Sequence, residues 1–368
     1  MLRAMVQPKR FSVRHIIHWF NMPNKKFKTG NPDIDQCILE LARLFAPSEN
    51  HEVIRLETLT TIAKFFLEHK DLGDYKLINT TLKELRHAFH IFLPYRDIRK
   101  VVIFGSARTE TSDPCYKMAS KLAELITHEG MMVITGAGGG IMEAANKGAG
   151  RKKSFGINIK LPFEQQVNPY IHSDPKLMEF KYFFTRKLIF IKESDATVLL
   201  PGGMGTLDEG FENLTLFQTG KSLPRPIILL EHGNSDYWKT WLDWVKAVLV
   251  KNKFISPDDM NLFQLKNSAK DACCAIRSFY RVYHSLRYFR GLTILRFTRP
   301  IPSKIIDRLN GEFMDIVADG DIYTSPPLKG EIKSHDGTDK MPRLVLKFNK
   351  KSFGRLNQMI RSINEWVD

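Results

Sequence analysis

The middle of the chain, from about residue 97 to 255, alternates short apolar runs with segments of helical periodicity. The runs with strand character are residues 101–104, 131–134, 156–159, 196–200 and 226–230. Strands that are separated by helices are joined by crossover connections, so the pattern predicts a parallel sheet with helices on both faces. Continuous apolarity is typical of buried parallel strands. The predicted fold class is therefore α/β, with a doubly wound parallel sheet as its core.

Two further segments flank this core. Apolar residues at helical spacing predict three amphipathic helices within residues 31–96, and a helical stretch is predicted from about 268 to 288. Residues 290–368 have a strand–helix–strand–strand–helix pattern, which predicts a small α+β domain. The expected organisation is a basic tail at 1–30, a helical extension at 31–96, an α/β domain at 97–288 and a small βαββα domain at 290–368.

The charge of the chain is strongly basic but unevenly distributed. Lys and Arg number 55 against 40 Asp and Glu, a net charge of +15, and residues 1–30 hold seven of the basic residues and no acid. A charged segment without a defined fold is most simply a solvated tail, so nucleic acid is not the expected partner. Apolar runs fall far short of the roughly 20 residues that span a bilayer. Four irregularly spaced cysteines predict no disulfide framework, and we expect a cytoplasmic protein without a membrane partner.

Three predicted strands run directly into glycine-rich turns that precede helices. The turns contain Gly105 and Ser106, then Gly138, Gly139 and Gly140, then Gly202, Gly203, Gly205 and Thr206. Carboxyl ends of parallel strands meet at one edge of a sheet, where ligands bind in open α/β folds. Glycine lets backbone N–H groups approach an anion closely, and the following helix adds the positive end of its dipole. These turns therefore predict a phosphate-binding edge in a Rossmann-like, nucleotide-binding domain.

The absence of two known nucleotide-binding motifs restricts the class of nucleotide that the chain is expected to bind. Gly105-Ser106-Ala107-Arg108 is not the GxGxxG fingerprint of a dinucleotide site, and the chain has no GxxxxGK[ST] loop for a triphosphate. A mononucleotide is the better-sized ligand. His15 with His18, and His87 with His90, lack an obvious third ligand, so no metal is expected. No lysine stands out as a pyridoxal-phosphate site, and no cofactor is expected.

Residues 201–209, Pro-Gly-Gly-Met-Gly-Thr-Leu-Asp-Glu, resemble the PGGxGTxxE motif of the Lonely Guy family of phosphoribohydrolases, once mislabelled lysine decarboxylases. Residues 183–187 resemble the arginine–lysine motif of that family, and residues 139–145 extend the match. The resemblance covers roughly residues 100–250. One departure is Phe183-Phe184, where plant-type members carry methionine and histidine. The family implies hydrolysis of the N-glycosidic bond of a nucleoside 5′-monophosphate, such as AMP, to free base and ribose 5-phosphate.

The resemblance implies roles for individual residues. Glu209 and Arg186 are the expected catalytic residues, Glu209 as a base or charge stabiliser and Arg186 as the group that orients it or binds phosphate. The expected phosphate- and substrate-binding residues are Gly202, Gly203, Gly205, Thr206, Gly105, Ser106, Gly138, Gly139, Gly140, Glu143 and Lys187. For Glu143, an exposed acid in the first turn of a helix explains the residue equally well, and Lys187 is expected to be a secondary contact rather than a catalyst.

Two other functions use the same phosphate-binding edge. A nucleotide sensor needs the glycines but not Arg186 and Glu209, and a carrier of a phosphorylated cofactor such as a pterin shares the fold. In the enzyme hypothesis, the family resemblance implies a homodimer or a higher even oligomer. The domain at 290–368 is then expected to be regulatory or to form the assembly, since it has no glycine turn or paired carboxylates at its strand ends.

Overall fold

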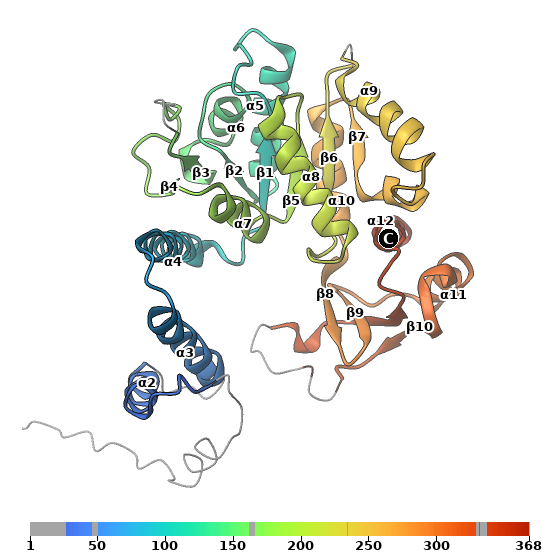
Figure 1. The fold of residues 1–368 in the computed structure, drawn as a ribbon. Helices are drawn as coiled ribbons and strands as arrows, with labels where there is room; N and C mark the ends of the chain where they lie inside the picture. The colour runs from blue at the N-terminus through green and yellow to red at the C-terminus, as the bar shows by residue number, and fades with distance from the viewer. Residues whose placement is uncertain are drawn as a thin grey trace, which may run out of the picture. The chain divides into compact units, whose positions relative to one another are not determined.

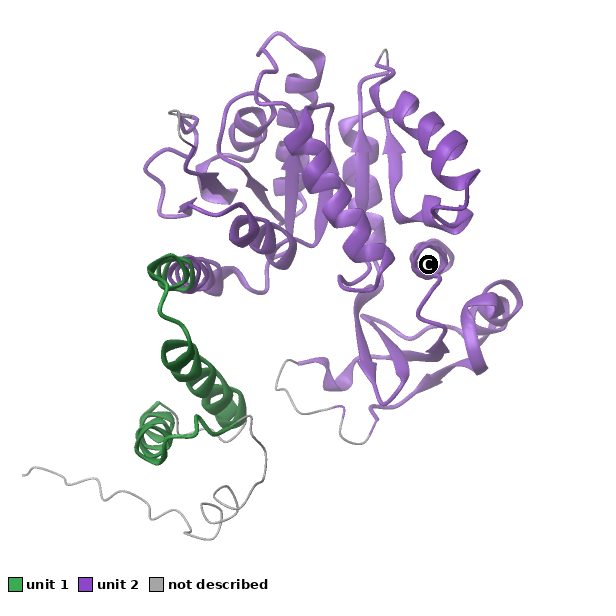
Figure 2. Ribbon diagram, in the orientation of Figure 1, with its two compact units in different colours: residues 1–80 green, residues 81–368 purple. Residues whose placement is uncertain are grey.

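The computed structural model describes residues 27–45, 51–161, 166–233, 235–328, 331 and 337–367. Most of the predicted basic tail at 1–30 therefore lies outside the described residues. The chain forms two compact units, residues 1–80 and residues 81–368 (Figure 2). In the first unit, α2 (Pro32–Leu44) packs on α3 (Glu52–Glu68) through buried Ile38, Ala42 and Leu56. The third predicted helix is α4 (Leu72–Phe92), and its residues from 81 onward belong to the second unit.

The second unit is built on a seven-stranded parallel sheet, which confirms the predicted fold class (Figure 1). Its strands are β1 (Lys100–Phe104), β2 (Met132–Thr135), β3 (Ser154–Ile159), β4 (Leu177–Phe180), β5 (Ala196–Leu199), β6 (Ile227–Leu230) and β7 (Gln264–Lys266). The strand order is β4-β3-β2-β1-β5-β6-β7. All five predicted strands of the core are present. The sequence pattern missed β4 and β7, because these two short strands form the edges of the sheet and lack a long apolar run.

Helices cover both faces of this sheet. Side chains alternate along β1, so Val101 and Ile103 pack with α5 (Pro114–His128), α6 (Ile141–Ala149) and α10 (Ala269–Phe279). Val102 and Phe104 point to the other face, which holds the buried residues of α7 (Phe183–Glu193), α8 (Met204–Gln218) and α9 (Tyr237–Trp244). Burial on both faces explains the continuous apolarity of the strands. None of the described helices combines the length and apolarity that a bilayer-spanning helix needs.

An antiparallel sheet forms the last part of the chain. It has the order β10-β11-β9-β8, from β8 (Tyr283–Phe289), β9 (Leu292–Phe297), β10 (Val317–Ser325) and β11 (Arg343–Phe348), with helices α11 (Ser303–Glu312) and α12 (Phe353–Trp366). The prediction of helix up to residue 288 was wrong, because α10 ends at Phe279 and β8 follows. Arg290 and Gly291, both with positive φ, form a tight turn that pairs β8 with β9. Within residues 290–368 the order is strand–helix–strand–strand–helix, as predicted, and β8 adds one strand before residue 290.

The terminal helix α12 joins this sheet to the α/β core. Asn364 accepts hydrogen bonds from the backbone N–H groups of Val282 (2.9 Å) and Tyr283 (3.2 Å). A Cβ on Gly354 would lie 1.9 Å from the carbonyl oxygen of Asp258, so only glycine allows this close approach. Buried apolar side chains of both sheets form one continuous cluster. The predicted domain division at residues 288 and 290 stays a prediction.

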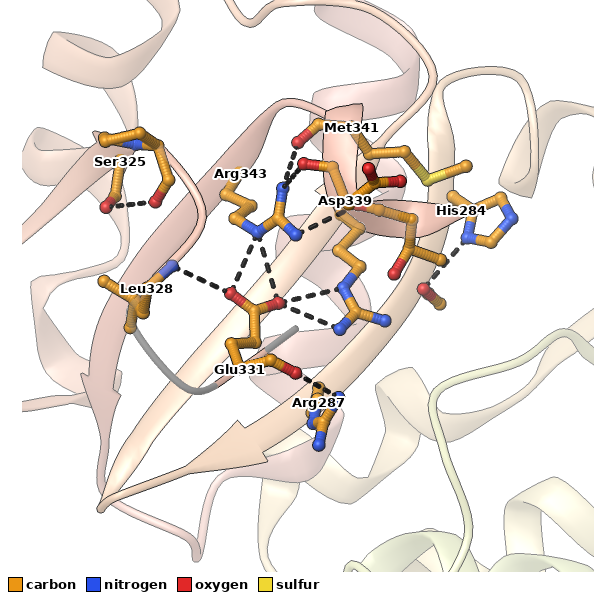
Figure 3. A network of polar contacts seen from close by, with 12 residues as sticks. His284, Arg287, Ser325, Leu328, Glu331, Asp339, Met341 and Arg343 are labelled. Carbon is orange, nitrogen blue, oxygen red and sulfur yellow. Dashed lines mark hydrogen bonds and ion pairs between the residues drawn. The ribbon is translucent and has the colours of Figure 1, made fainter. Parts of the chain in front are cut away.

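A buried charged network lies on one face of the antiparallel sheet (Figure 3). Arg296 of β9 and Arg343 of β11 are directly opposite each other in the strand register. Like charges in this position are destabilising. The fully buried Glu331 lies with them, accepting from Arg296 Nη2 at 2.8 Å and from Arg343 Nε at 3.0 Å. The carboxylate therefore compensates two arginines that would otherwise repel each other.

Candidate functional site

The three glycine turns that the sequence predicted to be neighbours are in direct contact at the carboxyl edge of the parallel sheet. The N–H of Ser106 donates to the carbonyl of Pro201 at 3.1 Å, and the N–H of Ile141 donates to the carbonyl of Ser106 at 3.0 Å. A Cβ on Gly140 would lie 2.3 Å from the Ser106 carbonyl oxygen, and one on Gly202 would lie 2.1 Å from Thr206 Oγ1. Gly140 and Gly202 are thus required by the packing of the turns themselves.

Two helices begin at these turns without a capping side chain. Gly140, with φ 61°, is the N-cap of α6, and Gly203 is the N-cap of α8. The first N–H groups of a helix have no partner within that helix, and the dipole makes this end attractive to an anion. Gly203 and Gly205 are exposed, and nothing lies within 4 Å of a Cβ placed on either. The fold therefore does not require glycine at these two positions.

Arg186 and Glu209 form a buried pair beside the turns. Arg186 Nη2 lies 3.9 Å from Glu209 Oε1, and the side chains are 15% and 5% exposed. Glu209 Oε2 and Arg186 Nε are shielded from water and have no hydrogen-bond partner among the described residues. A Cβ on Gly136 would lie 4.0 Å from Arg186 Nη1, which places the guanidinium next to the turn that follows β2. The structure therefore brings both predicted catalytic residues together at the predicted edge.

The electrostatics of this pair follow from its burial. Burial raises the pKa of Glu209 to about 7, even though Arg186 and Lys187 act in the opposite direction. Burial likewise lowers the pKa of Arg186, against the attraction of Glu209 and Asp208. A carboxyl group with a pKa near neutrality can both hold and release a proton at physiological pH. Perturbed pairs of this kind in a ligand-binding edge are typical of functional sites.

Glu143 and Lys187 have partners of their own. Glu143, in the first turn of α6, is half-buried and accepts a hydrogen bond from the Tyr116 hydroxyl at 3.0 Å. Burial, with Glu143 as a further cause, raises the pKa of Tyr116 to about 12. Lys187 Nζ lies 2.8 Å from Asp208 and 3.8 Å from Glu212 on α8. Its ion pairs therefore lie along α8, in keeping with the expected secondary role.

Several residues that the sequence did not single out hold the site in shape. Tyr237 of α9 donates from its hydroxyl to the Gly202 carbonyl at 2.7 Å. The Asn168 amide donates to the carbonyls of Ala137 (3.1 Å) and Gly138 (3.0 Å). Glu84 of α4 accepts from the Lys181 N–H at 2.6 Å and from the Thr185 hydroxyl, which fixes the start of α7. No local motif marks these residues, because each acts across 30 or more positions of the chain.

A metal centre is not evident in the described part of the chain, where no three His, Cys, Asp or Glu side chains group as metal ligands. The described histidines at 87 and 90 belong to α4 and not to the carboxyl edge. The polar groups at this edge include backbone N–H groups, one buried carboxyl group and one buried guanidinium.

Comparisons with known proteins concern this same part of the chain. The family model described as "Possible lysine decarboxylase" matches residues 142–276. A cytokinin riboside 5′-monophosphate phosphoribohydrolase from Mycobacterium tuberculosis is 27% identical over 172 residues, which cover 45% of this chain and 87% of that protein. A protein of the same name from Rhodococcoides fascians is 32% identical over 93 residues, covering 25% of this chain and 45% of the relative.

Solved structures with a similar fold include the molybdenum cofactor binding protein from Rippkaea orientalis. It is 24% identical, covers 49% of this chain and 95% of its own, and has a TM-score of 0.35. The family match includes the helix of Arg186 and the turn of Glu209, where the sequence motifs occur. The central α/β domain is therefore similar to proteins described as possible lysine decarboxylases and as cytokinin riboside 5′-monophosphate phosphoribohydrolases, in keeping with the resemblance of its motifs to the Lonely Guy family.

Proposed function

We propose that the protein hydrolyses the N-glycosidic bond of a nucleoside 5′-monophosphate, with AMP as the simplest candidate, and releases the free base and ribose 5-phosphate. The observation that carries this proposal is the buried Arg186–Glu209 pair beside three contacting glycine turns. The names of the relatives support the same reaction class. A site that only held phosphate would need the turns but not a buried carboxyl group next to them.

In this proposal the 5′-phosphate binds at the start of α8. Gly203 and Gly205 have open space where a side chain would project, so a phosphate oxygen can approach their N–H groups. Gly202 and Thr206 hold the turn closed, and Ser106 and Gly140 join it to the neighbouring turns. A ribose attached to this phosphate extends toward the second turn of α8, which contains Glu209. The expected order of contacts is therefore phosphate, ribose and then the C1′–N bond.

Bond cleavage then uses the carboxylate. As the C1′–N bond breaks, its electron pair moves to the base, and positive charge develops at C1′ and the ring oxygen. Ionised Glu209 stabilises this charge or takes a proton from the water that attacks C1′, and the departing base receives a proton. Arg186 favours the ionised carboxylate, against the effect of burial, and fixes its position. Glu143, on the neighbouring helix, is proposed to contact the ribose.

An apolar surface on α7 concerns the assembly of the proposed enzyme with a second copy of the chain. The outer side of α7 leaves Phe183, Phe184 and Leu188 about half exposed, at 53%, 54% and 48%. Exposed apolar residues that lie close together often mark a protein interface. We therefore propose, in line with the family resemblance, a homodimer or higher even oligomer in which α7 lies at the interface.

The decisive experiment measures base release. The purified chain is incubated with a panel of nucleoside 5′-monophosphates, and free base and ribose 5-phosphate are quantified by chromatography. Turnover of at least one member, with equal amounts of both products, supports the proposal. Binding of AMP without any base release would favour the nucleotide sensor, and tight binding of a phosphorylated pterin without cleavage would favour the carrier.

A further inference from the structure

A cavity lies at the opposite end of the parallel sheet from the glycine turns. It has a volume of about 860 Å³ and is lined by segments that precede β1, β5 and β6, together with the start of β8. Because parallel strands point the same way, these segments lie at the amino edge of the sheet, whereas the proposed catalytic site lies at the carboxyl edge. The volume falls within the range of small-molecule sites.

The lining of this cavity is strongly basic. It contains the cationic residues Arg96, Arg99, Lys192, Lys221, Arg225 and Arg296. Of these, Arg296 is paired with the buried Glu331 and Lys192 with Glu193. The acids of the lining are Asp97 and Asp195, and Asp195 is paired with Arg99 at 3.3 Å. Arg96 and Lys221 are exposed, and their side chains make no ion pair or hydrogen bond within the described residues. Positive charge is thus concentrated in a concave site, where it attracts an anion most strongly.

The interior of the cavity also holds buried polar groups without partners. Arg225 is 4% exposed and donates through both terminal nitrogens, yet its Nε has no partner among the described residues. The hydroxyl of Ser222 is also shielded from water and also has no hydrogen-bond partner among the described residues. Buried polar groups in native structures nearly always have a partner, so two unpaired donors in one cavity indicate a ligand.

Arg225 connects this cavity to the helices of the proposed catalytic site. Its Nη1 donates to the carbonyls of Ile191 (3.0 Å) and Ser194 (2.8 Å), at the end of the helix that contains Arg186. Its Nη2 donates to Asn213 Oδ1 at 2.5 Å, and Asn213 in turn donates to the Glu209 carbonyl at 2.8 Å. One buried side chain therefore contacts the end of α7 and, through one amide, the turn of α8 that contains Glu209.

We propose that this cavity binds a small molecule with two or more phosphate groups, and that Arg225 couples its binding to α7 and α8. Cations on both walls, Arg96 and Arg99 on one and Lys221 and Arg225 on the other, suit several separated negative charges better than one. Only the effect on turnover rests on the proposed function, since binding can be measured directly.

The binding experiment uses tripolyphosphate as the probe and the full chain in calorimetric titrations. The double variant Arg96→Ala/Lys221→Ala should weaken binding about tenfold or more, since it removes two exposed phosphate partners. The control is Lys270→Ala/Arg299→Ala, which removes one exposed lysine and one exposed arginine outside the cavity. Gly203→Ala, which alters only the glycine turns, should leave binding unchanged. No binding, equal weakening in the control, or loss of binding in Gly203→Ala alone would overturn the proposal.

The coupling is tested by hydrogen exchange, which does not depend on catalysis. Tripolyphosphate should slow amide exchange in residues 204–218, and this protection should be absent in Arg96→Ala/Lys221→Ala. Protection confined to the cavity, with none in α8, would overturn the coupling. If the chain also hydrolyses AMP, tripolyphosphate should change its kcat in the wild type and not in the double variant. If only AMP hydrolysis fails, the titration and hydrogen-exchange results still decide whether the cavity binds polyphosphate and couples to α8.

Discussion

Arg186 on α7 and Glu209 on α8 face each other across 3.9 Å, buried, with one polar atom of each side chain unpaired within the described residues. Two ions in optimal contact would form a shorter, hydrogen-bonded pair. The longer separation leaves hydrogen-bonding capacity on both side chains for a third group, such as the ribose or the water of the proposed reaction. In the proposed function, a ligand uses this capacity.

Replacing Glu209 by Gln should reduce kcat by about 10²-fold or more and leave AMP binding nearly intact. The change keeps the size of the side chain but removes the negative charge that stabilises the transition state, so the loss belongs in kcat. Base release and calorimetric titration with AMP measure the two effects separately. Near-normal kcat would move the catalytic role to Glu143.

Replacing Arg186 by Ala should also lower kcat, and the double variant with Glu209→Gln should lose less than the product of the single losses. An arginine that acts by positioning Glu209 has little left to position in the Gln variant. Losses that multiply in a double-mutant cycle would show that Arg186 acts independently, for example on the phosphate.

The pH dependence of kcat/KM should have a break near pH 7. The pKa of Glu209 is raised to about 7 by burial, so the ionised form needed as base is lost as the pH falls through this value. Rates with AMP between pH 5 and 9 measure the break. A flat profile across this range would mean that Glu209 does not titrate in the catalytic step.

The same raised pKa predicts a pH-dependent stability. The native carboxyl group binds its proton more tightly than the unfolded one, so between pH 4.5 and about 7 this group makes the folded state less stable as the pH rises. The full effect is up to about 3 kcal/mol. Urea unfolding at pH 5 and pH 8 should therefore show Glu209→Gln gaining stability over the wild type at pH 8 only. An equal difference at both pH values would contradict the buried, proton-binding state.

Gly203→Ala should fold normally but bind AMP at least tenfold more weakly. A methyl group at this position meets nothing within 4 Å, so folding is unaffected, whereas a phosphate at the start of α8 would collide with it. Circular dichroism and thermal melting check the fold, and titration checks the binding.

Adenosine, without a phosphate, should be a poor substrate of the wild type. Equal kcat/KM values for adenosine and AMP would show that the 5′-phosphate does not contribute to substrate binding, against the proposed binding mode.

Replacing Glu331 by Ala should destabilise the chain by about 3–5 kcal/mol, because it leaves Arg296 and Arg343 as unpaired buried charges. Although burial raises the pKa of Glu331, hydrogen bonds from the two arginines keep it below the usual value, so this stabilisation is lost as the pH falls below about 4.5. The control is Glu312→Ala, which removes an exposed partner of Arg308 and should cost under about 1 kcal/mol. Similar urea midpoints for the two variants would contradict the role of Glu331.

The sequence by itself determined the α/β class, the order of the core strands along the chain and the edge of the sheet at which the glycine turns meet. These features are local, since apolar runs define strands, and a turn after a parallel strand must lie at the carboxyl edge wherever that strand sits in the sheet. The pairing of Arg186 with Glu209 was anticipated only through the family resemblance. The sequence pattern did not predict the short edge strands or β8. In the case of β8, Tyr283 and its neighbours fit helical and strand spacing equally well.

Only the tertiary structure decided what surrounds the site. Glu84, Asn168 and Tyr237 reach the turns from distant parts of the chain, and no local pattern in the sequence encodes such long-range hydrogen bonds. The raised pKa of Glu209 likewise depends on burial by other elements. The bond of Arg225 to Asn213, and with it the link between two edges of the sheet, exists because packing brings α7, α8 and β6 together. The spacing of apolar residues specifies each helix or strand, whereas the elements that it packs against depend on the fold as a whole.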